Sequence, residues 1–310
     1  AKKLIGNYFK NPVILKEYLY IAGQTQEIYF SDIKAIKSKN GDIHTVYTQG
    51  VSGGPLENDL SEIYYIHISN NQVISSQQIS NDQTSSAGAV IAVAENNTVS
   101  IAWREGYSYA TQSGKTTLHY VEGDGFQSWA PQTILTDDNT DYLAITLEEN
   151  VPVIVYIYKE EFHLRKKKSA LWSDPIAINK PDIPKNELAK NAYNIHLFQN
   201  ENNIYDIFYL GMQKTNEYDL YTLRASVDTE TGASAVVNTQ SVTNRTGQDK
   251  IIDYKILKNS KGNYQVFYIK YEYLQNGSYA SRAFHLLFTG ANAYFKTHTS
   301  ALTMFVDNIT

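Results

Sequence analysis

Few residues of this chain have the type and spacing that chemistry requires, and the carboxylates come first. Asp141 and Asp253 stand at the starts of short apolar segments, the second within "KIIDYKIL". Two carboxyl groups facing one pocket are what glycoside hydrolysis ordinarily uses. The competing interpretation of Asp253 is a channel-lining residue whose oxygens are satisfied by water or backbone. Glu105, Glu148 and Glu149 are expected in solvated turns or loops.

The histidines suggest a metal site, but their spacing argues against one. His119, His163 and His285 share one position of a repeated pattern, which Tyr64 and Tyr221 occupy in its other copies. Packed sheets lie ~10 Å apart, whereas zinc ligands lie ~2 Å from the metal. These histidines are therefore predicted to be packing residues, and no metal site is expected. The sequence has no phosphate-binding loop or dinucleotide fingerprint, so no cofactor is expected either.

Two tryptophans have similar surroundings. "FQSWAPQTIL" (126–135) and "LWSDPIAI" (171–178) each place a tryptophan two or three residues before a proline, with an apolar tail after it. The recurrence indicates a repeated structural unit.

The repeat is clearest in five short segments that each end in an aromatic residue. These segments are "IHTVY" (43–47), "VSIAW" (99–103), "PVIVY" (152–156), "YDIFY" (205–209) and "YQVFY" (264–268), and the aromatics are separated by 56, 53, 53 and 59 residues. A turn rich in Asn or Gly and another apolar segment precede each one, which is the pattern of a β-hairpin. Further strands follow, and residues on both faces of the second strand are apolar, as expected for a sheet covered on both sides. The sequence predicts an all-β, five-bladed β-propeller with four strands per blade.

We expect one domain over residues 1–310, with repeats at about 31–81, 85–136, 141–179, 192–243 and 251–304. Residues 6–15 resemble a fourth strand without its first three, so they are predicted to close the last blade, with 293–310 outside that ladder or in place of it. Residues 16–30 belong to no complete repeat, and a sixth, divergent blade is the alternative.

The turn around Trp129 resembles the Asp-box repeats of sialidase-like propellers and their lectin relatives. In "LHYVEGDGFQSWAPQTIL" (118–135) a strand is followed by Asp124, Gly125, Trp129 and an apolar tail. The spacing departs from the usual box, and residues 160–178 lack the aspartate. The resemblance implies a propeller that binds sugars between its blades. Sialidase activity would also need an arginine trio and an "RIP"-like motif, and this chain has neither arrangement.

Composition and charge limit the classes of binding partner. The net charge is −5 and the pI is about 5.8, with "RKKK" (165–168) as the main basic run, expected at a solvated hairpin tip. This argues against nucleic acid as the partner. The apolar runs are too short to insert into a membrane. The chain contains no cysteine, which excludes disulfides and thiolate nucleophiles but does not specify the compartment. An extracellular or periplasmic protein is expected, with the cytoplasm as the alternative.

The functional prediction is a non-catalytic binding propeller whose ligand is a glycan or a protein. Trp129, Trp172 and Asp124 are the predicted ligand-binding residues, because a sugar ring stacks on indole and a carboxylate accepts its hydroxyl hydrogens. The competing interpretation of both tryptophans is a wedge that packs the turn against the next blade. The alternative function is a glycoside hydrolase acting through carboxylates at the mouth of the propeller. The sequence does not indicate an oligomeric state.

Overall fold

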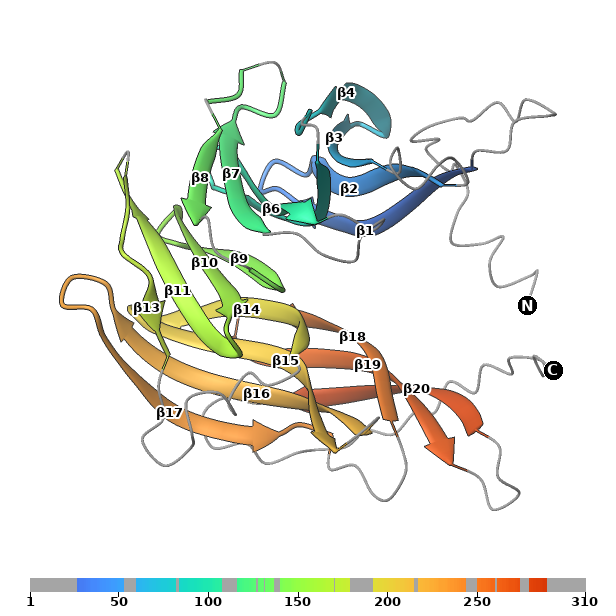
Figure 1. Ribbon diagram of the computed structural model, residues 1–310, viewed down its shortest axis with the longest axis vertical. Helices are drawn as coiled ribbons and strands as arrows, with labels where there is room; N and C mark the ends of the chain where they lie inside the picture. The colour runs from blue at the N-terminus through green and yellow to red at the C-terminus, as the bar shows by residue number, and fades with distance from the viewer. Residues whose placement is uncertain are drawn as a thin grey trace. The chain divides into compact units, whose positions relative to one another are not determined.

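The computed structural model describes the strands and most of their turns. Described residues are 27–52, 60–81, 84–107, 116–126, 128–130, 132–136, 140–169, 171–178, 192–214, 217–243, 250–259, 261–273 and 279–288. These residues form twenty β-strands in five antiparallel sheets, and no helix is among them (Figure 1). The fold is an all-β, five-bladed β-propeller, as the sequence predicts.

The chain divides into two compact units, residues 1–140 (unit 1) and residues 141–310 (unit 2). Unit 1 holds two four-stranded sheets in chain order. Blade 1 contains β1 (Glu27–Lys37), β2 (Ile43–Ser52), β3 (Ser61–Ser69) and β4 (Gln72–Gln78). Blade 2 contains β5 (Ser85–Val93), β6 (Val99–Tyr107), β7 (Thr117–Gly123) and β8 (Thr133–Thr136).

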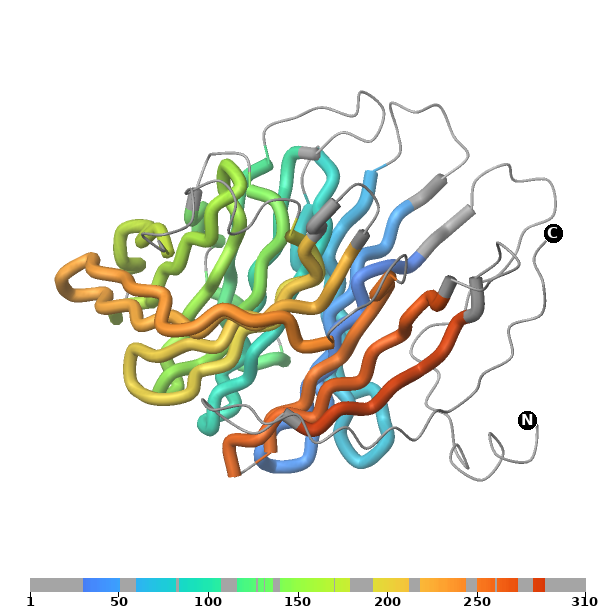
Figure 2. The backbone as a smooth tube through the Cα atoms, turned by 90° about the horizontal axis from the view of Figure 1, so that it is seen from below, coloured from blue at the N-terminus to red at the C-terminus, as the bar shows by residue number. Residues whose placement is uncertain are grey.

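Unit 2 holds three sheets with the same order of strands (Figure 2). Blade 3 contains β9 (Leu143–Glu148), β10 (Val151–Tyr158), β11 (Glu161–Lys168) and two short segments beside β11, namely β12 (Leu171–Trp172) and β13 (Ile176–Ala177). Blade 4 contains β14 (Tyr193–Glu201), β15 (Ile204–Lys214), β16 (Glu217–Asp228) and β17 (Ala233–Ser241). Blade 5 contains, among the described residues, β18 (Lys250–Lys258), β19 (Tyr264–Tyr273) and β20 (Tyr279–Phe288).

One aromatic pair recurs in every blade, where the second strand meets the third. The second-strand aromatic stacks on the residue directly opposite it, with ring centroids 5.1–5.7 Å apart, in the pairs Tyr47–Tyr64, Trp103–His119, Tyr156–His163, Tyr209–Tyr221 and Tyr268–Phe284. Four of the second-strand aromatics are buried and Tyr268 is half-buried. Stacked pairs in this geometry stabilise a sheet beyond the area they bury. The predicted equivalence of the five aromatics is confirmed.

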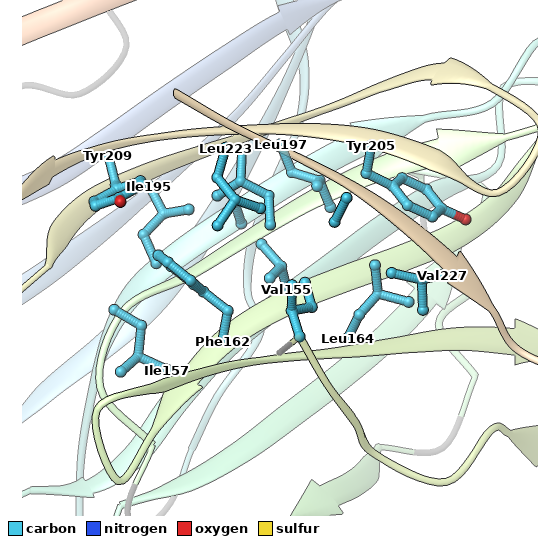
Figure 3. Close-up of a cluster of buried hydrophobic side chains, with 14 of the residues drawn as sticks. Val155, Ile157, Phe162, Leu164, Ile195, Leu197, Tyr205, Tyr209, Leu223 and Val227 are labelled. Atoms are coloured by element: carbon cyan, nitrogen blue, oxygen red, sulfur yellow. The ribbon is translucent and has the colours of Figure 1, made fainter. Parts of the chain in front are cut away.

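The hydrophobic cores lie between neighbouring sheets of a unit. In unit 2, Val155 and Phe162 of blade 3 pack against Leu197, Tyr205 and Leu223 of blade 4, and Figure 3 shows these side chains pointing toward one another. A second cluster joins blades 4 and 5, and a third joins blades 1 and 2. Strands covered on both faces have apolar residues on both faces, which explains why the second strands do not alternate.

A cluster of polar side chains crosses the junction between blades 1 and 2. His44 and His67 stack with ring centroids 4.3 Å apart, and both are buried. His44 Nδ1 lies 2.6 Å from the Tyr65 hydroxyl, and His67 Nε2 lies 3.1 Å from Asp42 Oδ2. Phe126, from the β7–β8 turn of blade 2, meets the edge of His67 at 4.9 Å. Burial, with a smaller contribution from the neighbouring His67, lowers the pKa of His44 to about 4.

Charged groups cross the junction between blades 4 and 5. Arg224 donates two hydrogen bonds to Asp206, at 2.6 and 2.7 Å, and the Tyr264 hydroxyl of blade 5 donates a third at 2.6 Å. The hydrogen bonds to Asp206 raise the pKa of Arg224, and burial raises that of Tyr264. Glu148 has a similar role between blades 3 and 4, where it accepts from Tyr205 at 2.5 Å and pairs with Lys166 at 2.6 Å.

Several predictions concern residues outside the described ranges. Residues 6–15, predicted to close the last blade, and residues 293–310 lie outside them, as does most of 16–30. The closing strand and the single domain therefore stay predictions. One expectation was wrong: "RKKK" does not form a solvated tip but the end of β11, where its side chains are half-buried and Arg165 Nε donates to the Ser173 carbonyl at 2.7 Å.

Candidate functional site

One position of the first strand is equivalent in all five blades by strand register. In each blade, the second-strand residue just before the stacked aromatic pairs with one residue of the first strand. These first-strand partners are Lys34, Val90, Ala144, His196 and Lys255. The equivalent position lies two residues before each of them. We call its occupants the leading residues: Asp32, Gly88, Tyr142, Asn194 and Asp253. In a propeller blade the first strand is the innermost one, next to the central channel.

The backbone is irregular at this position in four of the blades. Asp32, Gly88 and Asn194 lie inside register shifts of β1, β5 and β14, with φ of 53°, 66° and 49°. In β18 the shift falls immediately before Asp253. A β-bulge re-aims a side chain at a sheet end, and such bulges concentrate at binding sites. The bulges therefore mark this position as more than a packing position.

In unit 2, two leading residues of neighbouring blades are hydrogen-bonded to each other. Asn194 Nδ2 donates to Asp253 Oδ1 at 3.0 Å, and the Tyr254 backbone N–H donates to the same oxygen at 2.8 Å. Within the described part of the chain Asp253 forms no ion pair, and its Oδ2 accepts no hydrogen bond. The backbone hydrogen bond expected for Asp253 is present at Oδ1, and a place in the central channel stays a prediction.

Tyrosines surround this pair. The Tyr193 ring lies 6.0 Å from that of Tyr142 and 4.9 Å, edge to face, from that of Tyr218. Burial raises the pKa of Tyr193 to about 12, with smaller contributions from Tyr218, Tyr142 and Asp253. Tyr142 itself is 41% exposed. Neutral phenol rings next to an accessible carboxylate and an amide can stack on a sugar ring and bind its hydroxyls.

In unit 1 the leading residues are an aspartate, Asp32, and a glycine, Gly88. Asp32 Oδ2 accepts hydrogen bonds from the Gly88 backbone N–H at 3.2 Å and from Thr48 Oγ1 at 3.3 Å. A Cβ added at Gly88 would lie 3.1 Å from Nε of Arg104, so the guanidinium lies directly against this glycine. Unit 1 thus supplies a carboxylate and a guanidinium at this position.

A hollow of about 320 Å³ lies on blade 5, with Asp253 at its edge. Most of its lining is the flat apolar face of β18–β20, including Phe267 and Ile269. A face of this kind is what a neighbouring blade covers in a propeller, so we interpret it as packing surface. Asp253 itself is half-buried, so its side chain is partly exposed to solvent.

Asp124 and Trp129, two of the predicted ligand-binding residues, lie together in the β7–β8 turn. Asp124 Oδ1 accepts from the backbone N–H groups of Phe126 (2.8 Å) and Ser128 (3.2 Å), so it stabilises its own turn. Trp129 Nε1 donates to Gln77 of blade 1 at 2.5 Å, and its ring meets Tyr65 edge to face at 5.2 Å. These contacts are those of a wedge between blades; a ligand-binding role for the two residues stays a prediction.

Trp172 lies in unit 2, on the short strand β12. It is half-buried and pairs with Lys167 of β11, while its neighbour Leu171 is 74% exposed. The turn has no counterpart of Asp124, as the sequence indicates. Its predicted ligand-binding role also stays a prediction.

Two expectations about chemically capable residues need correction. Glu105 and Glu148 are buried strand residues, not solvated loop residues: Glu105 accepts from Trp103 Nε1 at 3.2 Å, and Glu148 holds the junction described above. His285 lies opposite Phe267, so the position shared by His119 and His163 belongs in blade 5 to Phe284. Asp141 lies just before the first strand β9, as expected, and its neighbour Tyr142 is the leading residue there.

Four residues at the leading position or beside it were not predicted from the sequence: Asn194, Tyr193, Tyr142 and Asp32. A usable signal existed for two of them, because Asn and Asp are the non-glycine residues that most readily adopt positive φ. An Asn or Asp at the start of a first strand was therefore a marker of the bulge.

Within the described ranges no group of three or more His, Asp or Glu side chains is arranged to hold a metal ion. The same residues include no helix with the length and hydropathy of a membrane span.

Comparisons with known proteins show similarity of fold. No family model matches the chain, and no curated protein matches it by sequence. A protein of unknown function from Dyadobacter fermentans is similar in structure, with a TM-score of 0.57, 11% identity, and coverage of 83% of this chain and 79% of that one. The NanB sialidase from Streptococcus pneumoniae has a TM-score of 0.58 and 8% identity over 96% of this chain and 64% of its own. The chain thus spans less than two thirds of that sialidase, and at these identities the comparison shows a sialidase-like propeller fold alone.

Proposed function

We propose that this protein is a non-catalytic, carbohydrate-binding propeller whose ligand is held at the leading position of unit 2. The observation that carries the proposal is the Asn194–Asp253 hydrogen bond beside the Tyr142–Tyr193 ring pair. The hydrogen bond fixes one carboxylate oxygen and leaves the other to accept a hydroxyl hydrogen. Tyrosine rings provide the apolar faces on which sugars stack. A glycan ligand would also agree with an extracellular or periplasmic location.

A broad glycan array, followed by calorimetric titration of the best hit, tests the proposal. Asp253→Ala and Tyr142→Ala should each weaken binding at least tenfold, since a hydrogen bond to a charged group contributes about 1.5–3 kcal/mol. Glu230→Gln is the matched control, because this exposed carboxylate of the same unit lies on the β16–β17 turn. If every glycan fails to bind while a protein ligand does, the carbohydrate assignment is wrong.

A second candidate function, glycoside hydrolysis, is favoured by one observation. Asp32 occupies in blade 1 the same leading position that Asp253 occupies in blade 5. Hydrolysis ordinarily requires two carboxyl groups, whereas each unit supplies one aspartate at this position, which favours binding. A chromogenic glycoside panel separates the two functions. Turnover that disappears in both Asp32→Asn and Asp253→Asn would establish hydrolysis in place of simple binding.

A further inference from the structure

The charges around Asp253 bear on which class of sugar this site would bind. Its carboxylate accepts two hydrogen bonds from neutral donors, Asn194 and the backbone of Tyr254, and within the described residues no cation pairs with it. A buried or half-buried carboxylate without a cation is costly unless a ligand or solvent supplies compensation. The site therefore has one uncompensated negative charge.

Four basic residues of unit 2 are engaged with carboxylates of their own, whereas Lys255, which lines the same hollow as Asp253, forms no ion pair with it among the described residues. Lys270 and Arg282 both pair with Glu272, at 3.0 and 3.1 Å. Arg224 is bound to Asp206, and Lys166 to Glu148. Each of these cations already has a carboxylate partner, so moving one to Asp253 would break an existing ion pair.

The tyrosines add a second feature that favours positive charge. The faces of Tyr142, Tyr193 and Tyr218 carry the negative part of the ring quadrupole, which attracts ammonium groups within about 6 Å of a ring centroid. Because burial holds the pKa of Tyr193 at about 12, its ring stays a neutral phenol at physiological pH.

Building on the proposed function, we propose that the ligand is an amino sugar with a free, protonated amine, as in an oligomer of glucosamine. The ammonium group pairs with Asp253 Oδ2, and the apolar face of the sugar ring lies on the tyrosines. A charge-assisted hydrogen bond of this kind is about twice as strong as a neutral one. N-acetylation removes the positive charge, and an acidic sugar brings a second carboxylate toward Asp253, so both are disfavoured.

Calorimetric titration with three tetrasaccharides tests the inference: the glucosamine tetramer, its fully N-acetylated form and cellotetraose. The glucosamine tetramer should bind about tenfold more tightly than the other two at low salt, and this preference should shrink as ionic strength rises. Asp253→Asn preserves the size of the side chain and should abolish the preference while leaving the weak binding of the neutral tetramers. Glu230→Gln removes an equal charge at an exposed turn and should leave the preference intact.

The outcomes distinguish the two proposals. Equal affinity for the three tetramers, or a preference that survives in Asp253→Asn, overturns the amino-sugar inference and leaves carbohydrate binding standing. Failure of all three tetramers and of the glycan array overturns both. Circular dichroism of Asp253→Asn verifies that a lost preference does not reflect unfolding.

Discussion

The junction between blades 1 and 2 and the junction between blades 4 and 5 fill similar places with groups of opposite kind. The first is a stack of two buried histidines linked to a tyrosine hydroxyl and an aspartate. The second is a bidentate arginine–aspartate pair that a tyrosine from the next blade completes. One junction depends on His44 staying neutral, whereas the other depends on an arginine–aspartate ion pair staying charged. The two units should therefore respond to different perturbations.

Removing the central carboxylate of the charged junction should have the largest effect. Asp206→Ala leaves the Arg224 guanidinium and the Tyr264 hydroxyl without their shared acceptor, and an uncompensated buried charge typically costs about 3–5 kcal/mol. Urea denaturation, followed by the fluorescence of Trp172 in unit 2, measures the loss. Glu230→Gln breaks an exposed ion pair with Lys168 and should change stability by less than about 0.5 kcal/mol. A loss below about 1 kcal/mol in Asp206→Ala would show that the junction does not depend on its ion pair.

Trp129→Ala should have the next largest effect, and it distinguishes a packing role of Trp129 between the blades from a ligand-binding role. The indole is half-buried against the core of unit 1, so its removal should destabilise that unit by about 3 kcal/mol, toward the low end for such truncations. Thermal melting together with glycan titration provides the measurement. Leu171→Ala, at a residue that is 74% exposed, is the control and should melt like the wild type. Unchanged melting with lost glycan binding would instead establish Trp129 as a ligand-binding residue.

Acid should weaken the histidine junction by about 2 kcal/mol. The folded state holds the pKa of His44 at about 4, below its ordinary 6.5, so the unfolded chain binds more protons between these values. The contribution is therefore complete above pH 6.5 and is lost as the pH falls toward 4. The facing groups are Asp42, His67 and the Tyr65 hydroxyl, with Asp124 near Tyr65.

Urea unfolding of wild type and His44→Gln at pH 7 and pH 4.5 isolates this contribution from that of other groups. The fluorescence of Trp103 and Trp129 reports on unit 1. The pH dependence of the wild type should exceed that of the variant, and equal slopes would contradict a role for His44.

The fold could be predicted from the sequence because the same strand pattern recurs along the chain. Tyr47, Trp103, Tyr156, Tyr209 and Tyr268 recur at nearly constant spacing, and each occupies the same stacked position. Because the pattern occurs five times, the fold assignment does not depend on the ambiguous assignment of any single strand. Apolar residues on both strand faces likewise follow directly from burial between two sheets.

The site was accessible only in part, because it depends on single-residue register. Asp253 could be identified as a carboxylate within a first strand, but Tyr142, next to Asp141, was not singled out, and His285 was assigned to the position where Phe284 stacks. A shift of one residue turns a strand side chain to the opposite face. Bulges at Asp32 and Asn194 introduce such shifts, and hydrophobic periodicity does not reveal them.

The bulges at the leading position have a consequence for how this protein can change. A residue in a bulge is released from the lateral pairing that constrains its neighbours, so its side chain can be replaced without rebuilding the sheet. The occupants already vary among the five blades: a carboxylate twice, a glycine, a phenol and an amide. Each blade thus presents one exchangeable side chain on an otherwise uniform scaffold. A small number of substitutions at these positions could redirect recognition to a different ligand while the stacked aromatic pairs continue to specify the fold.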